Sequence, residues 1–207
     1  MSFLPFPSPD DAMQASFAAE QEDLGFVMNL TRLWSYQPGL KDALFAVIGS
    51  VVEEHDLDFR TRGILVTAMA STLGDTYCSV AWGTKLAGET SGAHAAAVLG
   101  GDDAPLSPAE IALSEWARKI TRDPNATTAA DLEPLRAAGW TDRQIFGLTV
   151  FVALRIAFST VNDALGARPD AAYRSLAPRE VLDALPAGRP LDAEEQSSDY
   201  QQGVTAS

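Results

Sequence analysis

The centre of the chain reads DFRTRGILVTAMASTLGDTYCSVAWGTKLA over residues 58–87, and this stretch decides the fold. Its first half is almost uncharged after Arg62, so its composition would suit either a buried strand or a central helix. The length and the alanine content favour a helix over Asp58–Leu73. A Gly-Asp pair interrupts that helix, and a second helix is predicted from Asp75 to about Ala87.

Helical signals continue on both sides of this centre. Residues 107–110 (SPAE) and 141–144 (TDRQ) are capping boxes, in which the cap residue and the residue three positions later satisfy free backbone N–H groups. No segment shows sustained alternation of apolar and polar residues with hairpin turns. The sequence therefore predicts an all-α protein. Outside the central pair, the predicted helices cover residues 8–24, about 30–35, 40–54, 91–99, 107–122, 127 or 128 to 139, and 141–165, with one or two short turns in 171–185.

The length suits one domain, which we place at residues 1–186. Residues 187–207 turn polar and are predicted to form a flexible tail. The helix over residues 40–54 is predicted to bury one apolar face, and the apolar helices Ile64–Leu73 and Ile145–Val161 are predicted to bury surface against a second copy. The positions of that face in residues 40–54 are Leu40, Ala43, Leu44, Val47, Ile48 and Val51.

The composition excludes several classes of function. Lys and Arg number 15 against 28 Asp and Glu, a net charge of −13, whereas nucleic acids and anionic membrane surfaces attract clustered basic residues. We therefore expect no nucleic acid and no membrane as partners, and a small molecule as substrate. The single cysteine, Cys78, excludes a disulfide framework and a cysteine-rich zinc site within one chain. The N-terminus lacks the basic and apolar regions of a secretion signal, so we expect a cytoplasmic protein.

The longest apolar stretch, Ile145–Val161, carries one charge, Arg155, in its middle. This charge and the flanking caps predict a buried helix and not a membrane span. A buried guanidinium needs a carboxylate or several carbonyl groups. Arg155 therefore either pairs with an acid such as Asp75 or Asp163, which is the more common arrangement, or holds an anionic substrate.

Cys78 carries the best candidate chemistry. With Gly74 or Asp75 as the helix cap, it falls in the first turn, where free N–H groups and the helix dipole favour a thiolate. Asp75, Cys78, Trp82 and Lys85 are spaced by three, four and three residues, so they share one helix face. Asp75 is either a base for the thiol or a like charge that opposes its ionisation, and Lys85 lies about two turns further on. The alternative is that Cys78 is a small core residue.

The two histidines, His55 and His94, are predicted at exposed positions, and neither belongs to a metal-ligand pattern. One cysteine and two histidines that are far apart in the sequence do not form a typical set of metal ligands. The sequence also lacks the glycine-rich motifs that bind nucleotides and phosphates. We therefore expect neither a metal nor a cofactor.

Three segments point together to a known family. They are residues 57–87, with two arginines ahead of Gly-Asp-x-Tyr-Cys, residues 25–33 (GFVMNLTRL) before Pro38, and residues 161–166 (VNDALG) followed by Pro169-Asp170. In this order they resemble the core and the two ends of peroxidase-related members of the carboxymuconolactone decarboxylase and alkylhydroperoxidase D (AhpD-like) superfamily. The resemblance covers about residues 20–172. It implies an AhpD-like multi-helix bundle that assembles into dimers, trimers or hexamers.

For active members, the resemblance implies a thiol relay of a Glu, a Cys-x-x-Cys pair and a His four residues after the second Cys. Carried over by position, the second Cys is Cys78, the first falls on Asp75, the His on Trp82 and the Glu on Gly63. In the two-cysteine cycle one thiolate attacks the peroxide and its neighbour resolves the sulfenic acid. That cycle cannot run within this chain.

Three functions remain open from the sequence. The first is a one-cysteine, peroxidase-like antioxidant enzyme in which Cys78 attacks a hydroperoxide, Asp75 is the base, Lys85 or Arg155 gives electrostatic support, and an external thiol reduces the product. The second is a lyase or isomerase resembling the decarboxylase branch, which would bind a small acidic molecule through Arg155. The third is a non-catalytic oligomer that keeps the scaffold. Tyr77 and Trp82 are further candidates for substrate contact or structural support.

Overall fold

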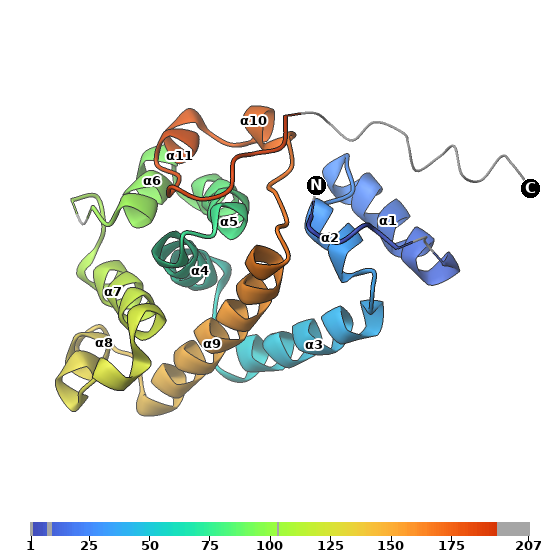
Figure 1. Cartoon of the computed structure of the whole chain (residues 1–207). Coiled ribbons are helices and arrows are strands. Elements are labelled where there is room, and N and C mark those ends of the chain that lie inside the picture. The colour runs from blue at the N-terminus through green and yellow to red at the C-terminus, as the bar shows by residue number, and fades with distance from the viewer. Residues whose placement is uncertain (1, 8–9, 103, 194–207) are drawn as a thin grey trace, which may run out of the picture.

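The computed structural model describes residues 2–7, 10–102 and 104–193, and every regular element in these ranges is a helix (Figure 1). The predicted all-α class is therefore confirmed. The α-helices are α1 (Asp11–Leu24), α2 (Asn29–Trp34), α3 (Pro38–Glu54), α4 (Phe59–Leu73), α5 (Thr76–Glu89), α6 (Gly92–Gly100), α7 (Pro108–Arg122), α8 (Glu133–Ala137), α9 (Asp142–Ala164), α10 (Tyr173–Leu176) and α11 (Arg179–Asp183). Two 3₁₀ turns, η1 (Pro124–Ala126) and η2 (Ala129–Leu132), connect α7 to α8.

Helix α4 is the centre of the core, and it packs against α5, α6, α7 and α9 (Figure 1). Every residue from Gly63 to Ala70 is buried, which explains why this stretch lacks charge, since a helix covered on all sides has no solvated face. At its end Gly74 has a φ of 75°, a left-handed conformation that glycine adopts without strain. The chain then turns directly into α5.

Local capping signals place most of the helix ends. Ser107 and Thr141 form the two predicted capping boxes at the starts of α7 and α9. Gly25 ends α1 in the left-handed conformation. These ends depend on contacts within three or four residues, which a sequence reveals directly.

Two predicted helices differ from the structure. The first helix begins at Asp11 with Asp10 as its cap, whereas Ser8-Pro9, the predicted start, lies outside the described residues. The predicted helix over residues 127–139 is replaced by η2 and the short α8. Pro134 explains this break, because proline lacks the N–H group that a continuous helix would need there.

The apolar face predicted for residues 40–54 is largely uncovered within one chain. In α3 only Ile48 is buried, whereas Val47 is 52% exposed. Helix α3 runs out from the body and packs mainly along α9 (Figure 1). The prediction of a buried face is therefore wrong for the single chain, because α9 covers only one side of α3.

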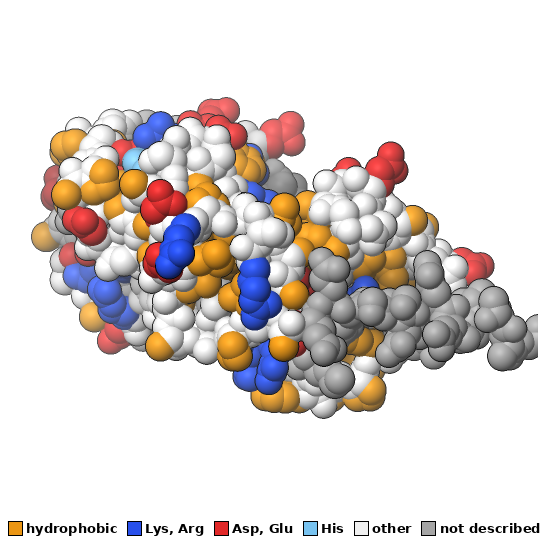
Figure 2. All heavy atoms as spheres, turned by 90° about the horizontal axis from the view of Figure 1, so that it is seen from above, with side chains coloured by type: hydrophobic (Ala, Val, Ile, Leu, Met, Phe, Trp, Pro, Cys, Tyr) orange, Lys and Arg blue, Asp and Glu red, His pale blue; other side chains and the backbone are white. Residues whose placement is uncertain are grey.

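Helix α9 is long and apolar enough to cross a membrane by length and composition alone. It nevertheless lies against α3, α4 and α7, and its central charge, Arg155, is buried. These contacts are those of a core helix, as the sequence predicts. Its outward side stays open, with Phe146 66% exposed. Figure 2 shows that hydrophobic side chains also reach the surface on another face, between scattered charges.

Both histidines are buried, which corrects the prediction that they are exposed. The ring of His55 lies over Gly147 of α9, where an added Cβ would clash with it. His94 Nε2 lies 3.3 Å from Glu110 Oε1, and that carboxylate also accepts hydrogen bonds from Arg60. Their partners come from distant helices, so the polar residues next to them in the sequence were a poor guide.

The residues after α11 return across the helical body. Asp192 N donates a hydrogen bond to Pro169 O at 2.8 Å, and Asn29 Nδ2 donates to Asp192 Oδ2 at 3.2 Å. The described part of the predicted polar tail, up to residue 193, thus lies against the domain. The remainder, residues 194–207, lies outside the described residues.

The junction of α5, α6 and α11 depends on Gly83. A Cβ added there would lie 2.9 Å from Val181 Cγ1 and 3.3 Å from Leu99 Cδ1. We expect Gly83→Ala to lower the free energy of unfolding, measured by urea denaturation, by about 1–3 kcal/mol through overpacking. Gly88→Ala in the same helix is the control, because nothing lies within 4 Å of its added Cβ, and it should stabilise by about 0.5–1 kcal/mol. Equal effects of the two substitutions would contradict this packing.

Candidate functional site

Cys78 lies in the first turn of α5, as the sequence predicts. Asp75 is the N-cap of this helix, and its Oδ1 accepts a hydrogen bond from Cys78 N at 2.9 Å. The thiol is 2% exposed and Asp75 is fully buried. The cap therefore fixes a carboxylate beside a buried thiol, out of contact with solvent.

Helix α9 supplies the other side of the site. Arg155 Nη2 lies 3.9 Å from Cys78 Sγ, and Ser159 Oγ donates a hydrogen bond to the same sulfur at 3.4 Å. The two residues are four apart, so they lie on one face of α9. Both are buried. Sequence reasoning singled out Arg155 but missed Ser159, whose spacing from Arg155 was the available signal.

Aromatic rings, and not a carboxylate, surround the Arg155 guanidinium. Its Cζ lies 5.2 Å from the ring centroids of Trp82 and Phe158 and 5.7 Å from that of Phe45, distances at which a cation is attracted to an aromatic face. The predicted ion pair with Asp75 or Asp163 is absent from the described residues, which is a correction. Arg155 Nε also has no hydrogen-bond partner there. A buried cation thus lies beside the thiol without a neutralising carboxylate in contact.

Trp82 and Lys85 lie further along α5, and Trp82 contacts the same Arg155 guanidinium that lies beside Cys78. Trp82 stacks on Phe59 with ring centroids 5.8 Å apart, and Lys85 Nζ lies 5.3 Å from the Trp82 centroid. Lys85 makes no hydrogen bond to the sulfur. Partial burial against the ring, and then the charge of Arg155, lower the pKa of Lys85. Lys85 thus contacts the Trp82 ring, which in turn contacts Arg155.

The thiol is held in its neutral form in this conformation. Burial raises the pKa of Cys78 to about 12, and the negative charge of Asp75 adds to this rise, whereas Arg155 and the Ser159 hydroxyl act in the opposite direction. The prediction of a thiolate at the helix entrance is therefore wrong for this structure. Desolvation outweighs the helix dipole here. Of the two roles predicted for Asp75, base or opposing charge, its effect on the pKa of Cys78 is that of the opposing charge.

Tyr77 is buried and joins a hydrogen-bond network with distant segments. Its hydroxyl donates a short hydrogen bond to Asp170 Oδ2 and accepts one from Leu30 N at 3.3 Å. Asp170 Oδ1 accepts another from Asn29 N at 2.9 Å. Burial raises the pKa of Asp170 to about 6. This network joins α5, α2 and the segment after α9, and Asp170 was not predicted as part of it.

Several buried polar atoms around the thiol have no hydrogen-bond partner in the described structure. On α5 and its cap they are Asp75 Oδ2, Thr76 Oγ1 and Ser79 Oγ, and on α9 they include Asn162 Nδ2. Buried polar groups are normally satisfied, but atoms without a partner also occur elsewhere in the described core, on Thr67, His55 and His94, so they do not by themselves mark this interface. In the described part of the chain, no group of three or more His, Cys, Asp and Glu side chains is arranged to hold a metal ion.

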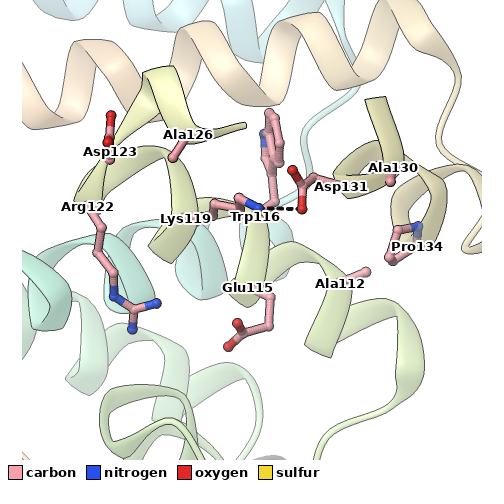
Figure 3. A pocket seen from close by; sticks show the side chains of 10 residues that line it. All are labelled: Ala112, Glu115, Trp116, Lys119, Arg122, Asp123, Ala126, Ala130, Asp131 and Pro134. Atoms are coloured by element: carbon pink, nitrogen blue, oxygen red, sulfur yellow. Dashed lines mark hydrogen bonds and ion pairs between the residues drawn. The ribbon is translucent and has the colours of Figure 1, made fainter. Parts of the chain in front are cut away.

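A separate hollow of about 530 Å³ lies between α7 and the segment from η1 to α8 (Figure 3). Lys119 reaches across it to Asp131 with an ion pair of 2.5 Å. Trp116 forms part of its wall and donates a hydrogen bond to Thr149. None of the predicted site residues lines this hollow, so it is separate from the Cys78 site between α5 and α9.

No family model matches the chain, and neither does any curated protein. Solved structures do match it. An alkylhydroperoxidase AhpD core protein from Ralstonia eutropha JMP134, an uncharacterized peroxidase-related protein, has 24% sequence identity and a TM-score of 0.74 over 83% of this chain and 94% of that chain. An uncharacterized peroxidase-related protein from Silicibacter sp. TM1040 has 25% identity and a TM-score of 0.75 over 83% and 93% of the two chains.

A third solved structure shares the fold at lower identity. It is the debrominase Bmp8, a cysteine-to-alanine variant in complex with 2,3,4-tribromopyrrole, with 16% identity and a TM-score of 0.65 over 89% of this chain and 100% of that chain. The AhpD-like fold expected from the resemblance is thereby confirmed. Because the fold includes peroxidase-related proteins and a debrominase, the fold alone does not define the reaction.

The charge of Asp75 can be removed without losing the cap, because Asn caps helices as well as Asp does. Since Asp75 raises the pKa of Cys78, we expect Asp75→Asn to move the midpoint of thiol alkylation by iodoacetamide down by about 1–2 pH units. The control is Asp58→Asn, which changes the equivalent cap of α4 and should leave the midpoint in place. A midpoint that stays or rises in Asp75→Asn would contradict the electrostatic role of this carboxylate.

Proposed function

We propose that this protein is a one-cysteine, peroxidase-related oxidoreductase that reduces hydroperoxides at Cys78, with an external thiol as the reductant. The observation that carries the proposal is the buried Arg155 guanidinium, 3.9 Å from the sulfur and without a carboxylate in contact. A buried cation is costly unless an anion compensates it. A Cys78 thiolate, formed during reaction, is the anion best placed to do so.

A proton transfer within the site would create that thiolate without changing the net charge of the site. Asp75 accepts from Cys78 N through one oxygen, and its second oxygen, Oδ2, is buried without a partner. If the thiol proton moves to Asp75, a neutral acid and a thiolate replace a carboxylate and a thiol. Arg155 and Ser159 then stabilise the sulfur anion. In this scheme Asp75 is the base, as the sequence suggests.

The redox step balances with the groups at hand. The thiolate attacks the outer oxygen of the hydroperoxide, the S–O bond forms and the O–O bond breaks, and the alkoxide leaves with the proton that Asp75 received. The products are a Cys78 sulfenic acid and an alcohol. Two external thiols then reduce the sulfenic acid through a mixed disulfide, releasing water and a small disulfide.

The packing around Gly63 and Trp82 supports a one-cysteine reaction and not a rebuilt relay. These residues stand where the resemblance implies the Glu and the His. A Cβ added at Gly63 would lie 3.1 Å from Leu86 Cδ1, so a Glu side chain would need the α4 and α5 interface to repack. Trp82 is fixed between Phe59 and Arg155 and supplies a ring in place of an ionisable group.

The same arginine favours one rival function. Without a carboxylate in contact, Arg155 could also hold a small carboxylate ligand, as in a lyase or isomerase related to the decarboxylase branch. The resemblance of the fold to a debrominase structure with a bound halogenated pyrrole shows that small ring compounds occur with this scaffold. The lyase or isomerase reaction would depend on Arg155 and not on the sulfur.

Titration of the purified protein with hydrogen peroxide tests the proposal. We expect addition of one oxygen atom at Cys78 by mass spectrometry, reversal by a small thiol, and turnover that Cys78→Ser abolishes. Arg155→Met should slow the oxidation by on the order of tenfold, because it removes the charge that favours the thiolate. Arg143→Met, an exposed arginine at the start of α9, is the matched control and should oxidise at the normal rate.

Peroxide turnover that persists in Cys78→Ser would overturn the proposal. A rise in melting temperature with small carboxylates, lost in Arg155→Ala, would then identify the lyase or isomerase alternative. If neither effect is seen, the chain is a retained scaffold. The cytoplasmic location remains part of the proposal, since a reducing compartment would supply the external thiol.

Self-assembly is a second part of the proposal. Helices α3 and α9 lie side by side, and large apolar side chains on both are exposed, with Leu40 51%, Val47 52% and Phe146 66% accessible. Exposed large apolar side chains on neighbouring helices are typical of an interface. We propose that a second copy of the chain covers these side chains to form a homo-oligomer.

Sedimentation at several concentrations checks this assembly. The unmodified chain should sediment above the monomer mass, and Val47→Asp should shift it toward the monomer by placing a charge in the apolar contact. Leu176→Asp on α10 is the control, because this side chain is equally exposed at 52% but lies outside the α3 and α9 surface. A monomer mass at all concentrations for the unmodified chain would contradict the assembly.

A further inference from the structure

A short irregular segment, residues 187–192, covers the end of α5 that holds Cys78, and we name it the strap. It follows α11 and runs back past α5 toward the N-terminal helices, as the red trace in Figure 1 shows. No helix forms in it. Ala187, Gly188 and Pro190 are exposed, so on this side only a single layer of chain separates the first turn of α5 from solvent.

Gly188 is the point of closest contact between the strap and the site. A Cβ added there would clash with Gly74 O and with Thr76 Oγ1. These two residues flank Asp75, the cap whose carboxylate binds Cys78 N. The backbone of the strap therefore lies directly on the turn that positions the thiol, and only a glycine fits.

The strap is anchored at Arg189 and at its last two residues. Arg189 Nη2 donates to Asp163 O at 2.9 Å, and its guanidinium carbon lies 4.7 Å from the Phe3 ring centroid. Arg174 donates to Leu191 O at 3.2 Å and to Asp192 O, Asp192 also bonds with Pro169 O, Asn29 and Arg168, and the partly buried Leu191 packs against the core. These anchors leave Ala187, Gly188 and Pro190 exposed, and an irregular surface segment opens at a lower free energy than the whole domain unfolds.

The described neighbours of the sulfur belong to regular helices. Arg155 and Ser159 lie in the middle of α9, and α4 packs against α5 through residues that are wholly buried. Moving either helix would disrupt the hydrophobic core. Moving Gly188 of the strap would uncover Gly74 and Thr76, which flank Asp75 in the chain.

We infer that the strap is a gate, which must lift from the first turn of α5 before a reagent or substrate can reach Cys78. This inference deepens the proposed function, since it says how a hydroperoxide enters a site whose sulfur is 2% exposed. Lifting the strap also returns water to the thiol and to Asp75. Because burial is the largest cause of the raised thiol pKa, opening favours the reactive thiolate as well as access.

Alkylation of the single cysteine measures the gate directly, without peroxide. In the full chain we expect slow reaction of Cys78 with iodoacetamide. Gly188→Ala, which cannot seat the strap on Gly74 and Thr76, should react on the order of tenfold faster. Gly88→Ala in α5, whose added Cβ meets nothing within 4 Å, is the matched control and should react at the rate of the unmodified chain.

Two truncated chains provide the second comparison. A chain ending at Ala193 keeps the strap and should alkylate slowly, whereas a chain ending at Pro186 lacks it and should alkylate at least as fast as Gly188→Ala. If the shorter chain does not fold, Arg189→Ala replaces it, since this variant loses the bond to Asp163 O. Cys78 can react either after local opening of the strap or after global unfolding of the chain. The dependence of the alkylation rate on urea separates these two routes, because local opening exposes little surface and global unfolding exposes much.

The gate is confirmed if the faster alkylation depends only weakly on urea in a variant that melts cooperatively. It is overturned if the folded chain ending at Pro186, or Gly188→Ala together with Arg189→Ala, reacts no faster than its control. It is also overturned if all alkylation follows global unfolding. If alkylation shows the gate but the protein does not reduce hydrogen peroxide, only the proposed function is rejected. The two conclusions are therefore tested separately.

Discussion

The structure depends on one buried cation. Arg155 lies in the middle of α9, the longest of the described helices, and meets three aromatic rings and a sulfur atom instead of a carboxylate. Cation and ring contacts of this kind each provide on the order of 1 kcal/mol, less than the cost of burying an unpaired charge. The rings of Phe45, Trp82 and Phe158 come from α3, α5 and α9, so three different helices enclose the guanidinium.

Opposite charges act on the thiol from its two sides. Asp75 on the α5 cap raises the pKa of Cys78 and Arg155 on α9 lowers it, while burial has the largest effect and keeps the sulfur protonated. The same burial raises the pKa of Asp163 to about 7, with the charge of Asp75 adding to the rise and Arg189 opposing it. The polar interface therefore holds a carboxyl group, that of Asp163, and a thiol, that of Cys78, whose pKa values depend on how much water reaches them. An increase in hydration would move both in the direction of ionisation.

The sequence predicts those parts of the fold that local contacts determine. Capping boxes at Ser107 and Thr141 and the uncharged centre of α4 place helices correctly, because each signal acts within a few residues. What surrounds a helix cannot be read in this way. The open side of α3, the burial of His55 against Gly147 and the absence of an acid beside Arg155 depend on distant segments. For the site, helical spacing placed Asp75, Cys78, Trp82 and Lys85 on one face, whereas Ser159, Phe45 and the residues of the strap come from tertiary packing.

Burial of the thiol and its reactivity are opposed requirements, and the architecture separates them. The sulfur is held by two core helices that cannot move without loss of the core, so its geometry relative to Arg155 and Ser159 stays fixed. On the side of Asp75, a short irregular segment lies on the first turn of α5, held by hydrogen bonds, an ion pair and the packing of Leu191 and not by secondary structure. A deeply buried sulfenic acid would be protected from further oxidation but would also be closed to an external thiol. A rigid site under a movable cover satisfies both conditions, because each turn of a one-cysteine cycle requires two different molecules to reach the same sulfur.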